Sequence, residues 1–391
     1  MNKKAIEVKR KFENAQKKLS SSVVDRDEII ESVLIASLAK EHILMIGVPG
    51  VAKSLIARNL SLFFSGEHYY EYLLTKFTSP DEIFGPFSIK GLENDKFYRI
   101  TSKKLPEASI VFLDEIFKAN SAILNSLLTI LNERIYHNNG HKEKCPLVSV
   151  IGASNELPNG PELAALYDRF LIKHMIEPID QSRFINYLMA KINPPEVSED
   201  EIITPEELNL AQKDIKNMSL DEEIYDTFLN CKDFLEEVKI FPSDRTWRKC
   251  INIIKSYSWF HNEDGDYSVK LEHLIYLRNV LWSEPLQYNK INDKLIDTVK
   301  PLKETIDNFH KQSLDWYRNA KKEFVDSGKK DVKTVVEKAK QLSLWYEETQ
   351  KVLESQNENT KRYKSAKELS DKIFEYHQNL IDMALSYRGS D

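Results

Sequence analysis

The sequence predicts an α/β fold in which a parallel sheet is followed by helical domains. Five short apolar runs alternate with helical patterns in the first half of the chain, as buried parallel strands do. A glycine-bearing turn of the P-loop type follows the first run. From about residue 204 every apolar pattern is helical. We therefore expect a helical lead-in over 1–19, an α/β core over 20–190, an all-α domain over 191–289 and a helical bundle over 290–391.

The composition is typical of a globular protein with several domains. The 391 residues carry a net charge of −6, so no overall positive field favours nucleic acid. Cys145, Cys231 and Cys250 are odd in number and scattered, which argues against a disulfide framework or a zinc site. No apolar h-region follows the basic amino terminus, and no run approaches the ~18 apolar residues of a membrane span. We expect a cytoplasmic protein.

The core elements can be placed in order along the chain. The lead-in is charged with few apolar anchors, and Ser20-Ser21-Ser22 is expected to end it. The acidic turn Asp25–Glu28 then begins a helix. Two β-hairpins are expected, at 85–106 and at 134–145, the second around Asn138-Asn139-Gly140. The expected strands are His42–Ile46, Tyr69–Leu74, Ser109–Leu113, Leu147–Ala153 and Leu171–Ile176.

Residues 290–391 contain three heptad-bearing segments, separated by Ser327-Gly328 and by the polar stretch 354–361. Segments of ~23 residues predict an antiparallel bundle of helices ~35 Å long. The alternative is three amphipathic helices that pack separately on the rest of the protein. The clearest segment repeats small and apolar residues at steps of three and four: Ala366, Leu369, Ile373, Tyr376, Leu380, Met383 and Tyr387.

The P-loop is the strongest functional signal. It runs Gly47-Val48-Pro49-Gly50-Val51-Ala52-Lys53-Ser54 and opens a helical pattern at Leu55. Consecutive backbone N–H groups and a helix N-terminus would bind phosphate there. Lys53 would reach the β- and γ-phosphates, and the Ser54 hydroxyl would ligate Mg²⁺. Ala52 replaces the usual second glycine, which is tolerated if that residue does not need a positive φ. The alternative is an ordinary turn between a buried strand and a helix.

Polar residues at two strand ends complete the chemistry. Asp114 and Glu115 end the third apolar run. Asp114 would hold the Mg²⁺, directly or through water, and Glu115 would deprotonate the water that attacks the γ-phosphate. Asn155 follows the fourth run and is placed to position that water, although asparagine is common in any turn.

Arginines supply further candidates. Arg169 is either an ion-pair partner of Asp168 or an arginine finger that reaches the γ-phosphate of a neighbouring subunit. Arg245 and Arg248 lie at the start of a helix in the all-α domain, and their spacing does not decide which of them touches nucleotide.

Together these motifs resemble those of the MoxR family of AAA+ ATPases, above all the regulatory ATPase variant (RavA) type. The resemblance covers roughly residues 20–290. It rests on the P-loop, Ile110–Lys118, Ala122–Arg134, Ala153–Pro158 and Ala165–Lys173, with support from Thr78–Ile89 and Ser243–Lys249. It implies an AAA+ core of five parallel strands, a helix-2 insert hairpin at 85–106 and an all-α lid.

The resemblance also implies roles for single residues. Asp114 and Glu115 would be Walker B, Asn155 sensor 1, Arg169 the arginine finger and Arg245 sensor 2. With ATP and Mg²⁺ as ligands, it implies a nucleotide-binding set. Val23 and Val24 line the adenine pocket in this set, Leu55 also belongs to it, and Walker A is formed by Gly47, Val48, Pro49, Gly50, Val51, Ala52, Lys53 and Ser54.

Family similarity further implies a hexameric ring that remodels a partner protein together with a von Willebrand factor A-domain (vWA) protein. RavA-type proteins interrupt their triple-helical domain with a β-rich domain that contacts a lysine decarboxylase. Here only short polar stretches join the helices, so we expect no decarboxylase contact. Two alternatives are a nucleic-acid motor that uses the cations of the 85–106 hairpin, and a nucleotide-gated scaffold. The intact Glu115, Asn155 and Arg169 disfavour the scaffold.

Overall fold

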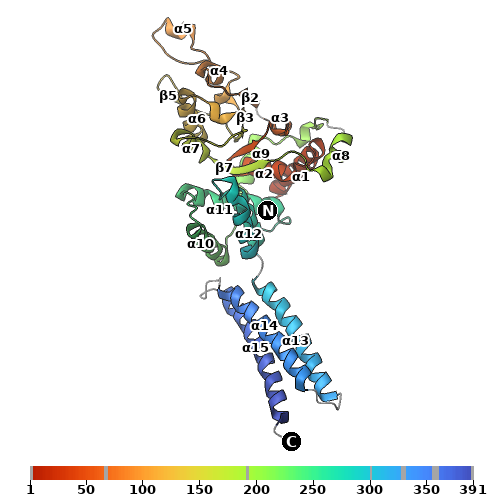
Figure 1. Ribbon diagram of the computed structural model, residues 1–391. Helices are drawn as coiled ribbons and strands as arrows, with labels where there is room; N and C mark the ends of the chain where they lie inside the picture. The colour runs from red at the N-terminus through yellow and green to blue at the C-terminus, as the bar shows by residue number, and fades with distance from the viewer. Residues whose placement is uncertain are drawn as a thin grey trace. The chain divides into compact units, whose positions relative to one another are not determined.

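The computed structural model describes residues 3–65, 69–190, 193–299, 302–326, 332–354 and 361–388 (Figure 1). The separators expected at Ser327-Gly328 and at 355–360 lie outside these ranges. The chain divides into two compact units. Unit 1 comprises Met1–Ser219, Pro242–Val269 and Tyr276–Tyr288, and unit 2 comprises Leu220–Phe241, Lys270–Ile275 and Asn289–Asp391.

The helices of the expected lid are shared between these units. Helices α9 (Pro205–Lys216) and α11 (Asp244–His261) belong to unit 1, whereas α10 (Glu222–Glu237) belongs to unit 2. The compact units therefore divide the chain differently from the domains expected from the sequence. The expected domain boundaries stay a prediction.

A five-stranded parallel sheet of order β2-β3-β6-β1-β7 forms the centre of unit 1, and it confirms the α/β fold. Every strand begins and ends within two residues of the run expected from the sequence. Helix α2 packs on β1, β6 and β7, and α3 packs on β3, which explains why these strands are almost continuously apolar. The strands are β1 (His42–Gly47), β2 (Tyr69–Leu73), β3 (Ile110–Asp114), β6 (Ser149–Ser154) and β7 (Phe170–Ile176).

The lead-in is a packed helix, α1 (Lys3–Ser22), and one expectation about it is wrong. The helix ends at Ser22, the last of the three serines, as expected, and the Ser21 and Ser22 hydroxyls donate to the carbonyls of Lys18 and Leu19 in its last turn. Its apolar anchors, however, are not few. A buried stripe at helical spacing consists of Ala5, Val8, Phe12, Ala15 and Leu19.

The expected hairpin at 134–145 is confirmed by β4 (Ile135–Asn138) and β5 (His141–Lys144). Its turn residues Asn139 and Gly140 have φ of +50° and +75°, as a type I′ turn requires. The insert at 85–106 pairs antiparallel only around Phe87 and Arg99. Its tip is a short helix, α5 (Ile89–Leu92), instead of a β-turn, because the Ser88 hydroxyl caps the Gly91 N–H.

The remaining described elements are α-helices and short 3₁₀ helices. They are α2 (Asp27–Ala39), α3 (Lys53–Ser61), α4 (Pro80–Phe84), η1 (Leu105–Glu107), η2 (Ile116–Lys118), α6 (Ser121–Glu133), α7 (Pro161–Tyr167), α8 (Gln181–Met189), η3 (Glu199–Glu201), η4 (Leu271–Asn279), η5 (Pro285–Gln287) and α12 (Tyr288–Val299).

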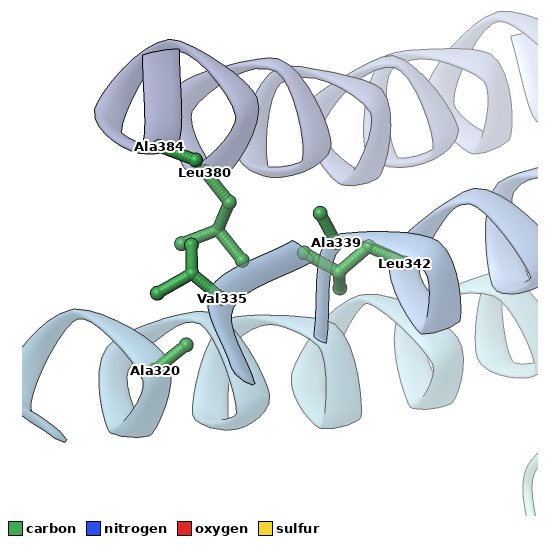
Figure 2. Packing of buried hydrophobic residues seen from close by; sticks show 6 residues of the cluster. All are labelled: Ala320, Val335, Ala339, Leu342, Leu380 and Ala384. Atoms are coloured by element: carbon green, nitrogen blue, oxygen red, sulfur yellow. The ribbon is translucent and has the colours of Figure 1, made fainter. Parts of the chain in front are cut away.

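The expected bundle is confirmed by α13 (Leu302–Asp326), α14 (Val332–Glu354) and α15 (Lys361–Arg388), which pack on one another. Figure 2 shows Leu380 of α15 directed toward Val335 of α14, and both belong to one buried cluster with Ala320, Ala339, Leu342 and Ala384. A second cluster is formed by Ile306, Leu353 and Ala366, and between the clusters the hydroxyls of Thr349 and Ser370 share a hydrogen bond. No helix within the described ranges has the length and apolar content to cross a bilayer.

Candidate functional site

The P-loop connects β1 to α3, and β1 is an interior strand of the sheet that lies between β6 and β7. Gly47 is required there because a Cβ would lie 2.2 Å from the Ile176 carbonyl oxygen. Gly50 and Ala52 both have positive φ, +84° and +68°. The condition under which alanine was considered tolerable at position 52, that the residue does not need a positive φ, is therefore not met. Left-handed residues in such a turn make the concave row of N–H groups that binds anions.

Lys53 begins α3 and is held by backbone carbonyls. Its ammonium donates to the Gly47 oxygen and, at 3.3 Å, to the Ser154 oxygen at the end of β6. Burial lowers the pKa of Lys53, while the carboxylates of Asp114 and Glu115 act in the opposite direction. The cation thus lies between the P-loop and the acidic pair.

The acidic pair lies at the carboxyl end of β3. Asp114 is the last residue of this strand, and its side chain accepts the Glu115 N–H at 2.9 Å. Glu115 is itself in the left-handed region, with φ of +52°, which costs ~1–3 kcal/mol and is typical of functional sites. Its Oε2 atom is buried and accepts no hydrogen bond, although the Lys118 ammonium lies 3.2 Å away.

Asn155 directly follows β6, the strand between β1 and β3. The register pairs Ser154 with Ile46 of β1 and Gly152 with Leu113 of β3. The exposed Asn155 therefore lies at the same sheet edge as the P-loop and Glu115. The structure brings Lys53, Asp114, Glu115 and Asn155 to one edge, as the sequence indicated.

A pocket of about 440 Å³ adjoins the P-loop. Val23, Val24, Leu55 and P-loop residues 48–52 line it, and these include the residues that the sequence assigned to an adenine pocket. Sequence reasoning missed its other lining residues, Arg26, Pro178, Ile179, Phe184 and Tyr187.

Arg26 shows why these residues were missed. Its buried guanidinium donates to the Glu177 carbonyl at 2.9 Å and to the Asp25 carbonyl at 2.8 Å, so it joins the start of α2 to the segment after β7. In the sequence it is an ordinary charge at a helix start. Phe184 and Tyr187 lie three residues apart in α8, a spacing that indicates one helix face but no ligand.

Arg169 lies away from the P-loop of its own chain. It precedes Phe170, which pairs with His42, whereas Gly47 of the P-loop pairs with Ile176. Along β1, five residue steps separate His42 from Gly47, a distance of ~16 Å. Arg169 donates to the Ala165 carbonyl at 2.8 Å, while its Nε is buried without a hydrogen-bond partner.

Arg245 lies with Arg169 and not with the P-loop. It donates to the Asn132 side chain at 3.1 Å. Burial lowers the pKa of Arg169, and the Arg245 charge lowers it further, against a weaker opposing effect of Asp168. The nearest oxygen of Asp168 is 3.9 Å from Arg169. Arg248, the other candidate, is exposed at the same helix start. The two arginines thus form a positive pair at the sheet edge opposite the P-loop.

The residues at the P-loop edge suit a magnesium nucleotide. Within the described ranges no three His, Cys, Asp or Glu side chains cluster as a metal cage. Ser54 and Asp114 instead offer two hard oxygen ligands, and Mg²⁺ is commonly bound by one or two such groups together with substrate phosphates. The unbonded Oε2 of Glu115 belongs to a carboxylate at this same edge.

Comparisons with known proteins bear on this geometry. A sequence model of the family described as the MoxR domain in MoxR-vWA-beta-propeller ternary systems matches residues 10–218, more than half of the chain. The chain belongs to the MoxR family of AAA+ ATPases. A second model, an AAA lid domain, matches residues 223–295. The resemblance seen in the sequence is confirmed at this level, and the RavA type stays a prediction.

Individual relatives agree with the MoxR family. An uncharacterised protein of Methanocaldococcus jannaschii is 40% identical over 282 residues, which are 72% of this chain and 74% of that protein. The protein named chaperone MoxR1 of Mycobacterium tuberculosis is 28% identical over 189 residues, 45% of this chain and 47% of its own. A solved structure of a candidate ATPase from Cytophaga hutchinsonii shares the fold, with a TM-score of 0.61 and 15% identity over 75% of this chain and 96% of that one.

Proposed function

We propose that this MoxR-family chain hydrolyses Mg²⁺-ATP in a ring of identical subunits and uses the reaction to remodel a partner protein. One observation carries the proposal. Lys53, Asp114, Glu115 and Asn155 converge at one sheet edge, beside a phosphate-binding turn and a pocket of about 440 Å³. This arrangement supports hydrolysis better than mere nucleotide-gated binding, because the base and the water-positioning amide are both present.

Each residue has a distinct task in this proposal. Lys53 and the P-loop N–H groups bind the phosphates, and Val23, Val24 and Leu55 enclose the adenine. Ser54 and Asp114 would hold Mg²⁺, which neutralises charge on the phosphates. Glu115 takes the proton of the attacking water, which Asn155 orients.

The positive pair of Arg169 and Arg245 supports action between subunits. The ~16 Å of strand between Arg169 and the P-loop of its own chain is longer than an arginine side chain. The Arg245 charge acts on Arg169, and the Asp168 carboxylate, 3.9 Å away, opposes this effect only in part, so the pair favours an anion from outside the chain. We therefore assign both the arginine-finger residue Arg169 and the sensor 2 residue Arg245 to the γ-phosphate bound by the neighbouring subunit. In a closed ring, which the family resemblance implies is hexameric, every nucleotide site receives the two arginines of a neighbouring subunit.

The family description supports a vWA protein as partner, since it places MoxR domains in systems with vWA proteins. The relative named chaperone MoxR1 supports remodelling as the outcome. The three cysteines are buried and form no disulfide with one another, which fits a reducing compartment such as the cytoplasm.

No structural observation favours the nucleic-acid motor. Two of the five cations of the 85–106 insert are held within the protein. Arg99 pairs with Asp81 and stacks on Phe87, and Lys104 donates to the Glu82 carbonyl.

Steady-state hydrolysis and ATP affinity of three variants test the proposal. Glu115→Gln should bind ATP normally and lose at least ~10²-fold in turnover, as removal of a positioned base does. Lys53→Ala should lose ATP binding. Lys90 is an exposed lysine of the insert, so Lys90→Ala is the control and should behave as wild type. Equal turnover of Glu115→Gln and wild type would end the assignment of Glu115 as the base.

A further inference from the structure

Lys118 lies against the carboxylate of Glu115. Its ammonium is 3.2 Å from Glu115 Oε2, the oxygen that is buried and accepts no hydrogen bond. The other oxygen of Glu115 is not among the buried unbonded atoms. Oε2 is thus the oxygen of Glu115 whose contact with the Lys118 cation the structure gives.

The local backbone dictates this contact. Glu115 is the N-cap of the 3₁₀ helix η2, and the Lys118 N–H donates to the Glu115 carbonyl at 2.8 Å. Side chains three residues apart eclipse one another in a 3₁₀ turn. Glu115 itself is in the left-handed region, with φ of +52°.

Buried neighbours fix the turn. Ile116 is fully buried, and Phe117 packs against Tyr167 with ring centroids 6.2 Å apart. The Lys118 side chain is 38% exposed, so its own packing contributes little to holding the turn. The turn is thus held by Ile116 and Phe117, and the ammonium is left as the functional part of Lys118.

We propose that Lys118 is a positioning residue for hydrolysis: it holds one oxygen of Glu115 and leaves the other to receive the proton of the attacking water. This inference rests on the role of Glu115 in the proposed function. A flexible carboxylate with two equivalent oxygens would point at the water only part of the time. Partly exposed ion pairs contribute little to stability, so the effect of Lys118 falls on geometry, to which reaction rates are far more sensitive.

Turnover and KM of Lys118→Met test the inference. We expect kcat to fall by ~10-fold or more, with KM for ATP and the melting temperature unchanged. Lys118→Arg, which keeps a cation at this place, should recover most of the rate. Lys90→Met is the matched control and should match wild type. If Lys118→Met melts early, Lys118→Gln replaces it, since glutamine keeps a polar stem without the charge.

A double-mutant cycle with Glu115→Gln separates positioning from a general structural role. Single-turnover rates would be measured with excess enzyme. Lys118→Met should change the residual rate of Glu115→Gln by less than ~2-fold, because no base remains to be positioned. An equal loss in both backgrounds, no loss in the wild-type background, or a loss of ATP affinity would overturn the inference. If Glu115→Gln alone turned over like wild type, the proposed function itself would have failed at that residue.

Discussion

Ala52→Gly tests the strained P-loop directly. Ala52 has φ of +68° and ψ of +18°, the left-handed region that alanine rarely adopts. That conformation costs an L-residue ~1–2 kcal/mol. Glycine removes this cost but makes the unfolded chain more flexible, which lowers stability by ~0.4–1 kcal/mol. The expected balance is a gain of up to ~1.5 kcal/mol in the free energy of unfolding.

Calorimetric unfolding of the full chain measures this change. A gain of 1 kcal/mol raises the melting temperature of a domain of 150–250 residues by ~2–4 °C. Nucleotide affinity should stay within ~2-fold of wild type, because the backbone that cradles the phosphates is unchanged.

Ala57→Gly is the matched control, since it makes the same substitution in the same helix-turn segment. Ala57 lies inside α3 and is fully buried, so the change should cost ~1 kcal/mol or more. The two variants should therefore move in opposite directions. If Ala52→Gly lowers the melting temperature as much as Ala57→Gly does, Ala52 is not left-handed and the described loop is wrong.

Two further predictions concern other parts of the chain. The first concerns Lys173. Its ammonium donates to the Val280 and Trp282 carbonyls, and burial lowers its pKa to about 8. Between pH 8 and ~10.4 the unfolded chain keeps the Lys173 proton that the folded chain has lost, so the free energy of unfolding should rise with pH across this window. Lys173→Met should remove that rise in denaturant titrations. In the bundle, Leu380→Asp places a charge at a fully buried site and should cost several kcal/mol, whereas Leu385→Asp, 58% exposed, should stay within ~0.5 kcal/mol. Helix content followed by circular dichroism during denaturation would compare the pair, and equal losses would contradict the described packing.

The sheet and the bundle were predictable from the sequence because their signals are local. Strands covered on both faces read as short apolar runs, and the bundle reads as apolar residues at steps of three and four. The P-loop, Asp114, Glu115 and Asn155 could be placed at one sheet edge because each lies at the carboxyl end of a strand in one parallel sheet. Their common edge then follows from topology alone.

Other features depend on contacts between distant segments, and sequence patterns do not report these. The lead-in reads as charged with few apolar anchors, yet α1 is packed through a buried stripe. The φ of Ala52 is set by the loop as a whole. Arg245 lies beside Arg169 because of where α11 packs, which the spacing of Arg245 and Arg248 left open.

Mixed oligomers test the central claim that hydrolysis takes place between subunits. Arg169→Ala should bind ATP and lose ~10³-fold in turnover, as loss of an arginine finger does. Lys53→Ala lacks a working P-loop but keeps Arg169. Mixing the two should give more turnover than the sum of the separate variants, because each supplies what the other lacks at a shared interface. Arg169→Ala mixed with a chain that carries both substitutions is the control and should gain nothing. If the first mixture is no more active than its parts, and wild-type specific activity does not depend on protein concentration, Arg169 acts within its own chain and the account is wrong.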